Sequence, residues 1–140
     1  MSRDSNCVFC RIVAGDIPST RVLETDDAIV ILDINPVVKG HLLVIPRAHH
    51  VLVGDLPDDL AGHVGSLLPR LTRSLASALG AEGTNVVINS GRVAGQEIDH
   101  CHWHLIPRFS GDPVRWPWPR DAYSGDDMAR TASRIVDGLG

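Results

Sequence analysis

Every second residue from position 100 to 104 is a histidine: His100, His102 and His104. Successive side chains of a β-strand point to opposite faces, so these imidazoles share one face and lie about 6.5–7 Å apart along it. The other face carries Trp103 and Leu105 and is apolar, so we expect it to pack on a helix. Packing does not explain three histidines in register, and the alternation therefore indicates a chemical site.

Three kinds of chemistry fit such a row of imidazoles. Imidazole is the commonest metal ligand, but a catalytic zinc needs three ligands that converge on one point, and positions i, i+2 and i+4 of a flat strand diverge. Two of the histidines could still bind a metal with help from elsewhere. General acid–base catalysis and covalent catalysis by a histidine nucleophile are the other two interpretations.

A loop that carries glycines and polar amides precedes the histidines. It runs from Asn89 through Gly95 to Gln96, after a segment with strand composition. Backbone N–H groups approach a phosphate closely where glycine has no side chain, so the loop is a candidate anion cradle. Its place four residues before the histidines indicates phosphate chemistry.

The elements that must position these residues follow from hydrophobic periodicity and from glycine and proline punctuation. The predicted helices cover residues 7–14, 57–79 and 125–138, and the predicted strands cover residues 21–24, 28–32, 41–45, 84–89 and 101–109. A proline- and tryptophan-rich tail, residues 110–124, should be extended. We predict one domain over residues 1–140, of the α+β class, with an antiparallel sheet and helices packed on one side.

Composition narrows the function. The 140 residues carry a net charge of -4, which supplies no basic face for nucleic acid. No signal peptide and no run of about 20 apolar residues is present, so we expect a cytoplasmic protein with no membrane partner. In a reducing cytosol, Cys7 and Cys10 are more often metal ligands or catalytic groups than a disulfide.

The sequence resembles the histidine triad (HIT) family, and its bacterial Hint-like branch most. The resemblance rests on Gly95-Gln96 followed by His-x-His-x-His-Leu-Ile-Pro-Arg, and it extends over most of the chain. The other matching segments are Cys7-Val8-Phe9-Cys10, Leu32-Asp33-Ile34-Asn35-Pro36 and Gly40-His41-Leu42-Leu43-Val44-Ile45-Pro46-Arg47. The resemblance implies the HIT-like fold: a five-stranded antiparallel sheet that joins a second copy into a ten-stranded sheet in a homodimer.

The resemblance also implies a reaction. His102 would attack the α-phosphate of a purine nucleotide and form a covalent nucleotidyl-histidine, which water or another acceptor resolves. Phosphoramidates and dinucleoside polyphosphates are the expected substrates, with His104 and Gln96 as further catalytic residues. The implied nucleotide-binding residues are Asp33, Ile34, Asn89, Gly95, Gln96, His102 and His104.

A structural Zn²⁺ is implied as well, and no catalytic metal. Its ligands would be Cys7, Cys10, His49 and His100, a donor set that forms closed tetrahedral sites. His50 could replace His49, although the spacing favours His49. Cys101 lies on the apolar face and is expected to pack.

Some positions depart from the family pattern or stay open. Glu97 stands where some members have a hydroxyl residue near the leaving group, and it could be a general acid or a solvated side chain. Asp99 has no predicted role. Trp116 and Trp118 either pack the tail on the core or form a wall of the acceptor pocket. We expected His41 to be structural or exposed.

Three functions compete on this basis. The first is the nucleotide hydrolase or transferase described above. The second is a nucleotide-binding regulatory protein with little turnover. The third is a metallohydrolase that uses the three histidines as catalytic ligands.

Overall fold

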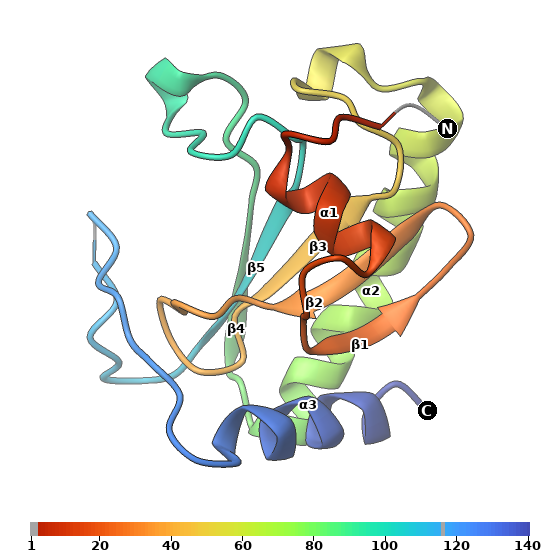
Figure 1. Cartoon of the computed structure of the whole chain (residues 1–140). Helices are drawn as coiled ribbons and strands as arrows, with labels where there is room; N and C mark the ends of the chain where they lie inside the picture. Colours follow the sequence, from red (N-terminus) through yellow and green to blue (C-terminus); the bar gives the residue numbers. More distant parts are fainter. Residues whose placement is uncertain (1–2, 116) are drawn as a thin grey trace.

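The computed structural model describes residues 3–115 and 117–140. Five antiparallel strands form one sheet in the order β1-β2-β3-β5-β4, and three α-helices accompany it (Figure 1). The strands are β1 (Arg21–Glu24), β2 (Ala28–Leu32), β3 (Leu42–Pro46), β4 (Gly83–Val87) and β5 (Trp103–Arg108). The helices are α1 (Val8–Ala14), α2 (Asp58–Leu79) and α3 (Asp127–Asp137), with short 3-10 turns η1 (Val53–Asp55) and η2 (Arg92–Ala94). The predicted α+β class and five-stranded sheet are confirmed.

The helices begin and end where their sequence directs. Cys7 caps α1 through its sulfur, which accepts a hydrogen bond from the Cys10 amide. Gly15 ends this helix with a φ of 85°, a left-handed conformation that glycine adopts without steric cost. Two acidic residues in the first turn of α2 complement the helix dipole, and Gly80 ends that helix in the same left-handed way.

Helices cover both faces of the sheet, which corrects the expectation that they pack on one side. The alternate residues Val30 and Val44 share a core with α2 and α3. Their neighbours Ile31 and Ile45 share a second core with α1, which lies on the opposite side of the sheet (Figure 1). The central strands β2 and β3 are consequently buried on both faces, which explains why their sequences are continuous apolar runs.

The histidine segment is only partly a strand. The ladder of β5 begins at Trp103, so His100 and His102 lie in the extended chain that leads into it. The apolar face behaves as predicted, because Leu105 is fully buried and Trp103 packs on the core that contains α2. His104 pairs with Leu43 across β3 and points to the other face, where α1 lies. Because the ladder begins only at Trp103, His100 lies outside it, and its side chain does not have to share a face with that of His102.

No helix among residues 3–115 and 117–140 is both long enough and apolar enough to cross a membrane.

Candidate functional site

The three histidines of the alternating segment have different surroundings. His102 and His104 line a cavity of about 720 Å³ beside α1 and the sheet. His100 is fully buried and turns instead toward Cys7, Cys10 and His49. The structure therefore divides the row of imidazoles between two sites, as the assignment of His100 to zinc and of His102 and His104 to the nucleotide requires.

The hydrogen bond of His102 fixes which of its nitrogens carries the proton. Its Nδ1 lies 2.7 Å from the carbonyl oxygen of His100. A carbonyl oxygen can only accept, so Nδ1 carries the hydrogen and Nε2 keeps a free lone pair. Burial lowers the pKa of His102, while the bond to the His100 carbonyl opposes this shift. An unprotonated nitrogen on the wall of a cavity is what a histidine nucleophile needs.

A chain of hydrogen bonds fixes His104 in the other tautomer. The amide of Val37 donates to His41 Nδ1 over 3.1 Å, so His41 carries its hydrogen on Nε2. That Nε2 lies 2.9 Å from His104 Nδ1 and donates to it. His104 then carries its own hydrogen on Nε2, which leaves a hydrogen-bond donor beside the lone pair of His102, with the two rings 4.9 Å apart.

Burial keeps this chain of imidazoles neutral. It lowers the pKa of His41 to about 3, with the neighbouring charges of His104 and Arg120 acting in the same direction. Burial also lowers the pKa of His104 to about 4, assisted by His102 and Arg120. Both residues therefore stay uncharged at neutral pH, and the tautomers derived from the hydrogen bonds persist.

Most of the predicted nucleotide-binding residues line the same cavity. These are Asp33, Ile34, Asn89, Gly95, His102 and His104. Gly95 follows η2 with a φ of 99°, a conformation that favours glycine, and its Cα faces the Asn89 amide. Ile34 is 69% exposed, an unusual state for isoleucine that leaves an apolar surface at the cavity. The loop and the sheet thus bring together residues as far apart in the sequence as Asp33 and His104.

Gln96 has a different place from the one expected of a residue that contacts phosphate. Its side-chain oxygen accepts from the Gly91 amide over 2.7 Å. Its amide nitrogen donates to the carbonyls of Val51 and Ile98 over 2.8 and 3.0 Å. The buried side chain thereby ties the two ends of the glycine loop to the segment after β3, and Gln96 is not among the residues that line the cavity.

Asp33 lies at the end of β2 with part of its carboxylate already engaged. One oxygen accepts from the Asn35 amide over 2.9 Å, and the other lies 3.9 Å from His41 Nε2. Burial raises its pKa, against the lowering effects of the Asn35 amide and the Arg120 charge. A half-buried carboxylate of this kind can accept hydrogen bonds from hydroxyl groups of a ligand.

A cluster of two cysteines and two histidines forms at the start of α1. Cys10 Sγ lies 3.3 Å from His49 Nδ1 and 3.6 Å from His100 Nδ1, and Cys7 Sγ lies 3.4 Å from His100 Nδ1. The two Nδ1 atoms are 3.3 Å apart. Zinc with bonds of about 2.0–2.3 Å to nitrogen and sulfur has tetrahedral ligands separated by about 3.3–3.8 Å. The four donor atoms fit a tetrahedral Zn²⁺ site.

Hydrogen bonds around the cluster support the same fit. His100 Nε2 donates to the Pro46 carbonyl over 2.8 Å, which presents the Nδ1 lone pair to the cluster. Backbone amides of Asp4 and Cys10 donate to the two sulfurs, as they do to thiolates. The residues present therefore suit a zinc ion, and hydrogen bonds already orient three of the four ligand side chains.

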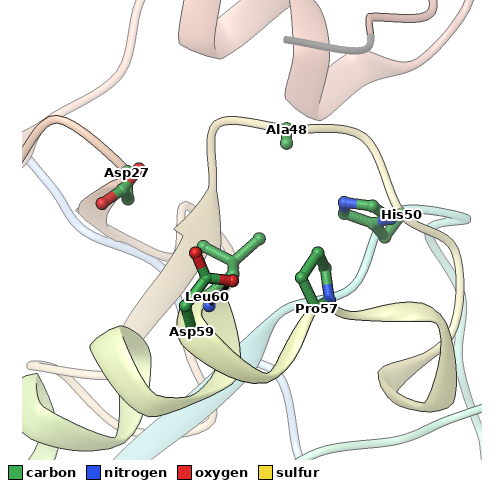
Figure 2. Close-up of a pocket in the computed structure, with 6 residues that line it drawn as sticks. All are labelled: Asp27, Ala48, His50, Pro57, Asp59 and Leu60. Atoms are coloured by element: carbon green, nitrogen blue, oxygen red, sulfur yellow. Dashed lines mark hydrogen bonds between the residues drawn. The ribbon is translucent and has the colours of Figure 1, made fainter.

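The structure distinguishes His49 from His50. His49 belongs to the cluster, whereas His50 lines a separate cavity of about 180 Å³ with Asp27 and Pro57. Figure 2 shows the His50 imidazole on the wall of that cavity, beside the Pro57 ring. Cys101 is buried away from the cluster, as expected of a packing residue.

Of the residues whose roles the sequence left open, some line the cavity and one lies outside it. Asp99 forms an exposed ion pair with Arg92 of 2.7 Å. Glu97 lines the cavity and pairs with Arg120 of the tail. Trp118 also lines the cavity and meets the His104 ring edge-on at 5.3 Å, so it forms a wall as well as packing. Trp116 lies outside the described residues.

Two residues take part in this site without a role predicted for them there. His41 was expected to be structural or exposed; it is buried and structural, and its hydrogen bond also orients His104, for which its position in an apolar run directly after Gly40 was a signal. Arg120 lines the cavity from the tail, and nothing in its sequence context separates it from the other arginines.

The three histidines of the alternating segment do not converge on one metal ion. His104 Nδ1 accepts a hydrogen bond from His41, while His100 faces the cysteines.

Comparison with known proteins shows which family this chain resembles in sequence. The family model described as HIT domain matches residues 14–111. The adenosine 5'-monophosphoramidase HNT1 of Candida albicans is 33% identical over 99% of this chain and 95% of its own. The adenylylsulfatase HINT3 of Arabidopsis thaliana is 36% identical over 77% of this chain and 55% of its own.

One solved structure shares this fold. The zinc-bound histidine triad family protein of Mycobacterium smegmatis superposes with a TM-score of 0.85 at 36% identity, over 95% of this chain and 92% of its own. From the cavity, the alternating histidines, the HIT domain match and these relatives together, it follows that the chain belongs to the histidine triad family.

Proposed function

We propose that the protein is a nucleotide hydrolase or nucleotidyl transferase that acts at the α-phosphate of purine nucleotides through a covalent intermediate on His102. The observation that carries this proposal is the tautomer of His102, whose Nε2 lone pair is free on the wall of the cavity. The names of two relatives, a monophosphoramidase and an adenylylsulfatase, support a reaction at an adenylyl group.

In the first step, the lone pair of His102 Nε2 attacks phosphorus and a P–N bond forms. The bond from phosphorus to the leaving group breaks, and its electron pair departs with the leaving group, which takes up a proton when it is an amine. Water then attacks phosphorus and a P–O bond forms, while the P–N bond to His102 breaks and its electron pair returns to Nε2. The nucleoside monophosphate is released, the proton lost by water passes to solvent, and the histidine is neutral again. The Nε2 hydrogen of His104 is placed to bind a phosphate oxygen as its charge develops.

The remaining contacts follow from the walls of the cavity. Asp33 would accept hydrogen bonds from the ribose hydroxyls, and the exposed Ile34 would pack on the purine base. Asn89 and Gly95 would bind the phosphate. We assign Gln96 an indirect part, because its three hydrogen bonds hold the glycine loop in shape.

A zinc ion would be held by Cys7, Cys10, His49 and His100. When bound, it supplies a structural crosslink between α1 and the two segments that carry the histidines. The carbonyl oxygen of His100 also accepts a hydrogen bond from His102 Nδ1. The position of the cluster therefore affects the orientation of the nucleophile.

The experiment is mass spectrometry of the intact protein after brief mixing with adenosine 5'-phosphoramidate. We expect a transient adduct of one AMP on the parent protein and no adduct on the His102→Ala variant, because the variant lacks the attacking nitrogen. His63→Ala is the matched control, since His63 lies on α2 and pairs with Thr25 outside the cavity. An adduct on His102→Ala would refute the assignment of the nucleophile. Binding without turnover over a wide nucleotide panel would favour the regulatory function.

A further inference from the structure

An ion pair links two walls of the nucleotide cavity. Arg120, in the tail before α3, places Nη2 at 3.2 and 3.4 Å from the two carboxylate oxygens of Glu97, which follows the glycine loop. Its Nη1 lies 3.5 Å from the carbonyl oxygen of Asn35, beyond the end of β2. Both charged residues line the cavity that contains His102 and His104. The guanidinium therefore lies between the loop predicted to bind phosphate and the segment predicted to bind the nucleoside.

Three contacts hold this part of the tail in place. The Trp118 ring packs edge-on against His104 and His41, with centroid distances of 5.3 and 6.3 Å. The Asp121 amide donates to the Pro36 carbonyl over 2.7 Å. The hydroxyl of Tyr123 accepts from the Gly40 amide over 2.7 Å. Arg120 lies between the first and second of these anchors, so its backbone is fixed beside the site.

Among the described residues that line the cavity, Arg120 is the only arginine or lysine. Two carboxylates, Asp33 and Glu97, accompany it, and burial favours the neutral form of the His102 and His104 imidazoles, whose hydrogen bonds set their tautomers. A nucleotide brings a further negative charge at its α-phosphate. Arg120 is then the cation available to any second anionic group that a substrate carries beyond that phosphate.

We propose that Arg120 makes the site selective for substrates whose leaving group is anionic, such as a sulfate or a phosphate, and that Glu97 restrains this selectivity by competing for the guanidinium. The proposal rests on the proposed function and specifies its substrate class. Arg120 is a specificity-determining residue in this scheme, while His102 remains the nucleophile.

The chemistry of the two kinds of leaving group explains the selectivity. Sulfate departs with the electron pair of the broken P–O bond as a dianion, and it needs no proton. Ammonia departs from a phosphoramidate with the electron pair of the broken P–N bond, and its nitrogen must be protonated. An arginine keeps its proton at any ordinary pH, so it stabilises the departing anion and offers the amine nothing.

The pair with Glu97 is suited to exchange. The side chains of Arg120 and Glu97 are 53% and 77% exposed, and ion pairs this open to solvent are weak. An entering sulfate can therefore replace the carboxylate at the guanidinium. Removal of the Glu97 charge frees Arg120 fully, so substitutions at the two positions should act in opposite directions.

The test compares kcat/KM for adenylyl sulfate and for adenosine 5'-phosphoramidate, which share the AMP half, on the zinc-loaded full chain. We expect the sulfate-to-phosphoramidate ratio to fall roughly fivefold in Arg120→Gln and to rise roughly twofold in Glu97→Gln, as partly exposed charges allow. Arg120→Lys, which keeps the charge, should restore part of the ratio. The exposed pair of Arg130 and Asp126 at the start of α3 gives matched controls, and Arg130→Gln and Asp126→Asn should leave the ratio at the parent value.

Equal losses with both substrates in Arg120→Gln would assign the residue to general nucleotide binding and overturn the proposal, as would an unchanged ratio. Far-UV circular dichroism and thermal melting establish that each variant is folded. Binding of both nucleotides to His102→Ala, alone and combined with Arg120→Gln, provides a second readout by titration calorimetry, in which the ratio of Kd values should shift in the same direction. If the parent turned over neither substrate, the proposed function would fail, and this binding ratio would still decide the role of Arg120.

Discussion

Three histidines of identical chemistry have separate tasks here because each ring nitrogen has a fixed partner. His100 gives its Nε2 hydrogen to the Pro46 carbonyl, and His102 gives its Nδ1 hydrogen to the His100 carbonyl. His104 receives a hydrogen from His41 at Nδ1. The remaining nitrogen of each ring consequently differs: a lone pair that faces the cysteines, a lone pair that faces the cavity and a donor that faces the cavity. Tautomers rather than residue types distinguish the three.

The stability of the protein should depend on pH through His41. In the unfolded chain this residue takes up a proton near pH 6.5, and in the folded state only near pH 3. Between these values the unfolded state binds more protons, so the free energy of unfolding falls as the pH is lowered below about 6.5. For one such group the slope reaches about 1.4 kcal/mol per pH unit.

Urea unfolding of the parent and of His41→Gln at pH 5, 6, 7 and 8, with zinc held constant, measures this contribution. The charged or titratable groups around His41 are His104, His102, Asp33 and Arg120, and all are present in both proteins. We expect the parent's advantage over the variant to be greatest at pH 7 to 8 and to shrink below pH 6.5. Parallel stability curves would show that His41 is not buried in its neutral form.

At the scale of elements, α1 connects the cluster of two cysteines and two histidines to the cavity. Cys7 caps the helix and Cys10 lies in its first turn, while Phe9 and Ile12 line the cavity. Phe9 also packs edge-on against the rings of His100 and His102, at 5.8 and 4.9 Å. A helix of seven residues is too short to be stable alone, so its attachment must come from the tertiary contacts and the cluster.

Loss of one zinc ligand should therefore loosen a wall of the cavity. We expect Cys10→Ser to lose bound zinc, to lose about 3 kcal/mol of stability at zinc concentrations near a hundred times the parent's Kd, and to bind AMP more weakly. Metal analysis, thermal unfolding and titration calorimetry measure the three effects. Cys101→Ser is the control, because this third cysteine is buried outside the cluster and should keep the metal. Full zinc content in Cys10→Ser would contradict the ligand set.

At the scale of the whole molecule, β1 and β4 are the two edge strands of the sheet. β4 pairs with β5 on one side, and its residue Val86 is 44% exposed although it faces the side of the sheet that carries α2. Natural proteins cover or blunt such edges. We propose that two copies pair along β4, as the resemblance to the family implies, and so form a ten-stranded sheet.

The dimer is tested by sedimentation equilibrium of the parent and of Val86→Asp. A carboxylate on this surface costs little in the monomer, because Val86 is already partly exposed, but it would be buried without a partner in the dimer. We expect the mass of two chains for the parent and of one chain for the variant. Val136→Asp is the matched control, since Val136 is 42% exposed on α3, and it should remain a dimer. A monomeric parent would refute the pairing.

Local sequence determined most of the fold. Continuous apolar runs set β2 and β3 at the predicted positions, and Gly15 and Gly80 ended their helices as expected, because these signals act within a few residues of the chain. The spacing of the histidines likewise indicated a chemical site. The placement of α1 on the second face of the sheet was not predictable in this way, since a short apolar helix carries no information about which face it covers.

Only the tertiary structure decided the finer chemistry of the site. The spacing favoured His49 over His50, but His50 stayed open as a zinc ligand because the direction of two adjacent side chains is set by the folded chain. From the sequence we predicted a phosphate contact for Gln96 and no role in the site for His41. In the folded chain the Gln96 side chain binds backbone groups instead, and His41 donates a hydrogen bond to His104. Hydrogen-bond partners distant in sequence fix tautomers and orient side chains, and those partners exist only once the chain is folded.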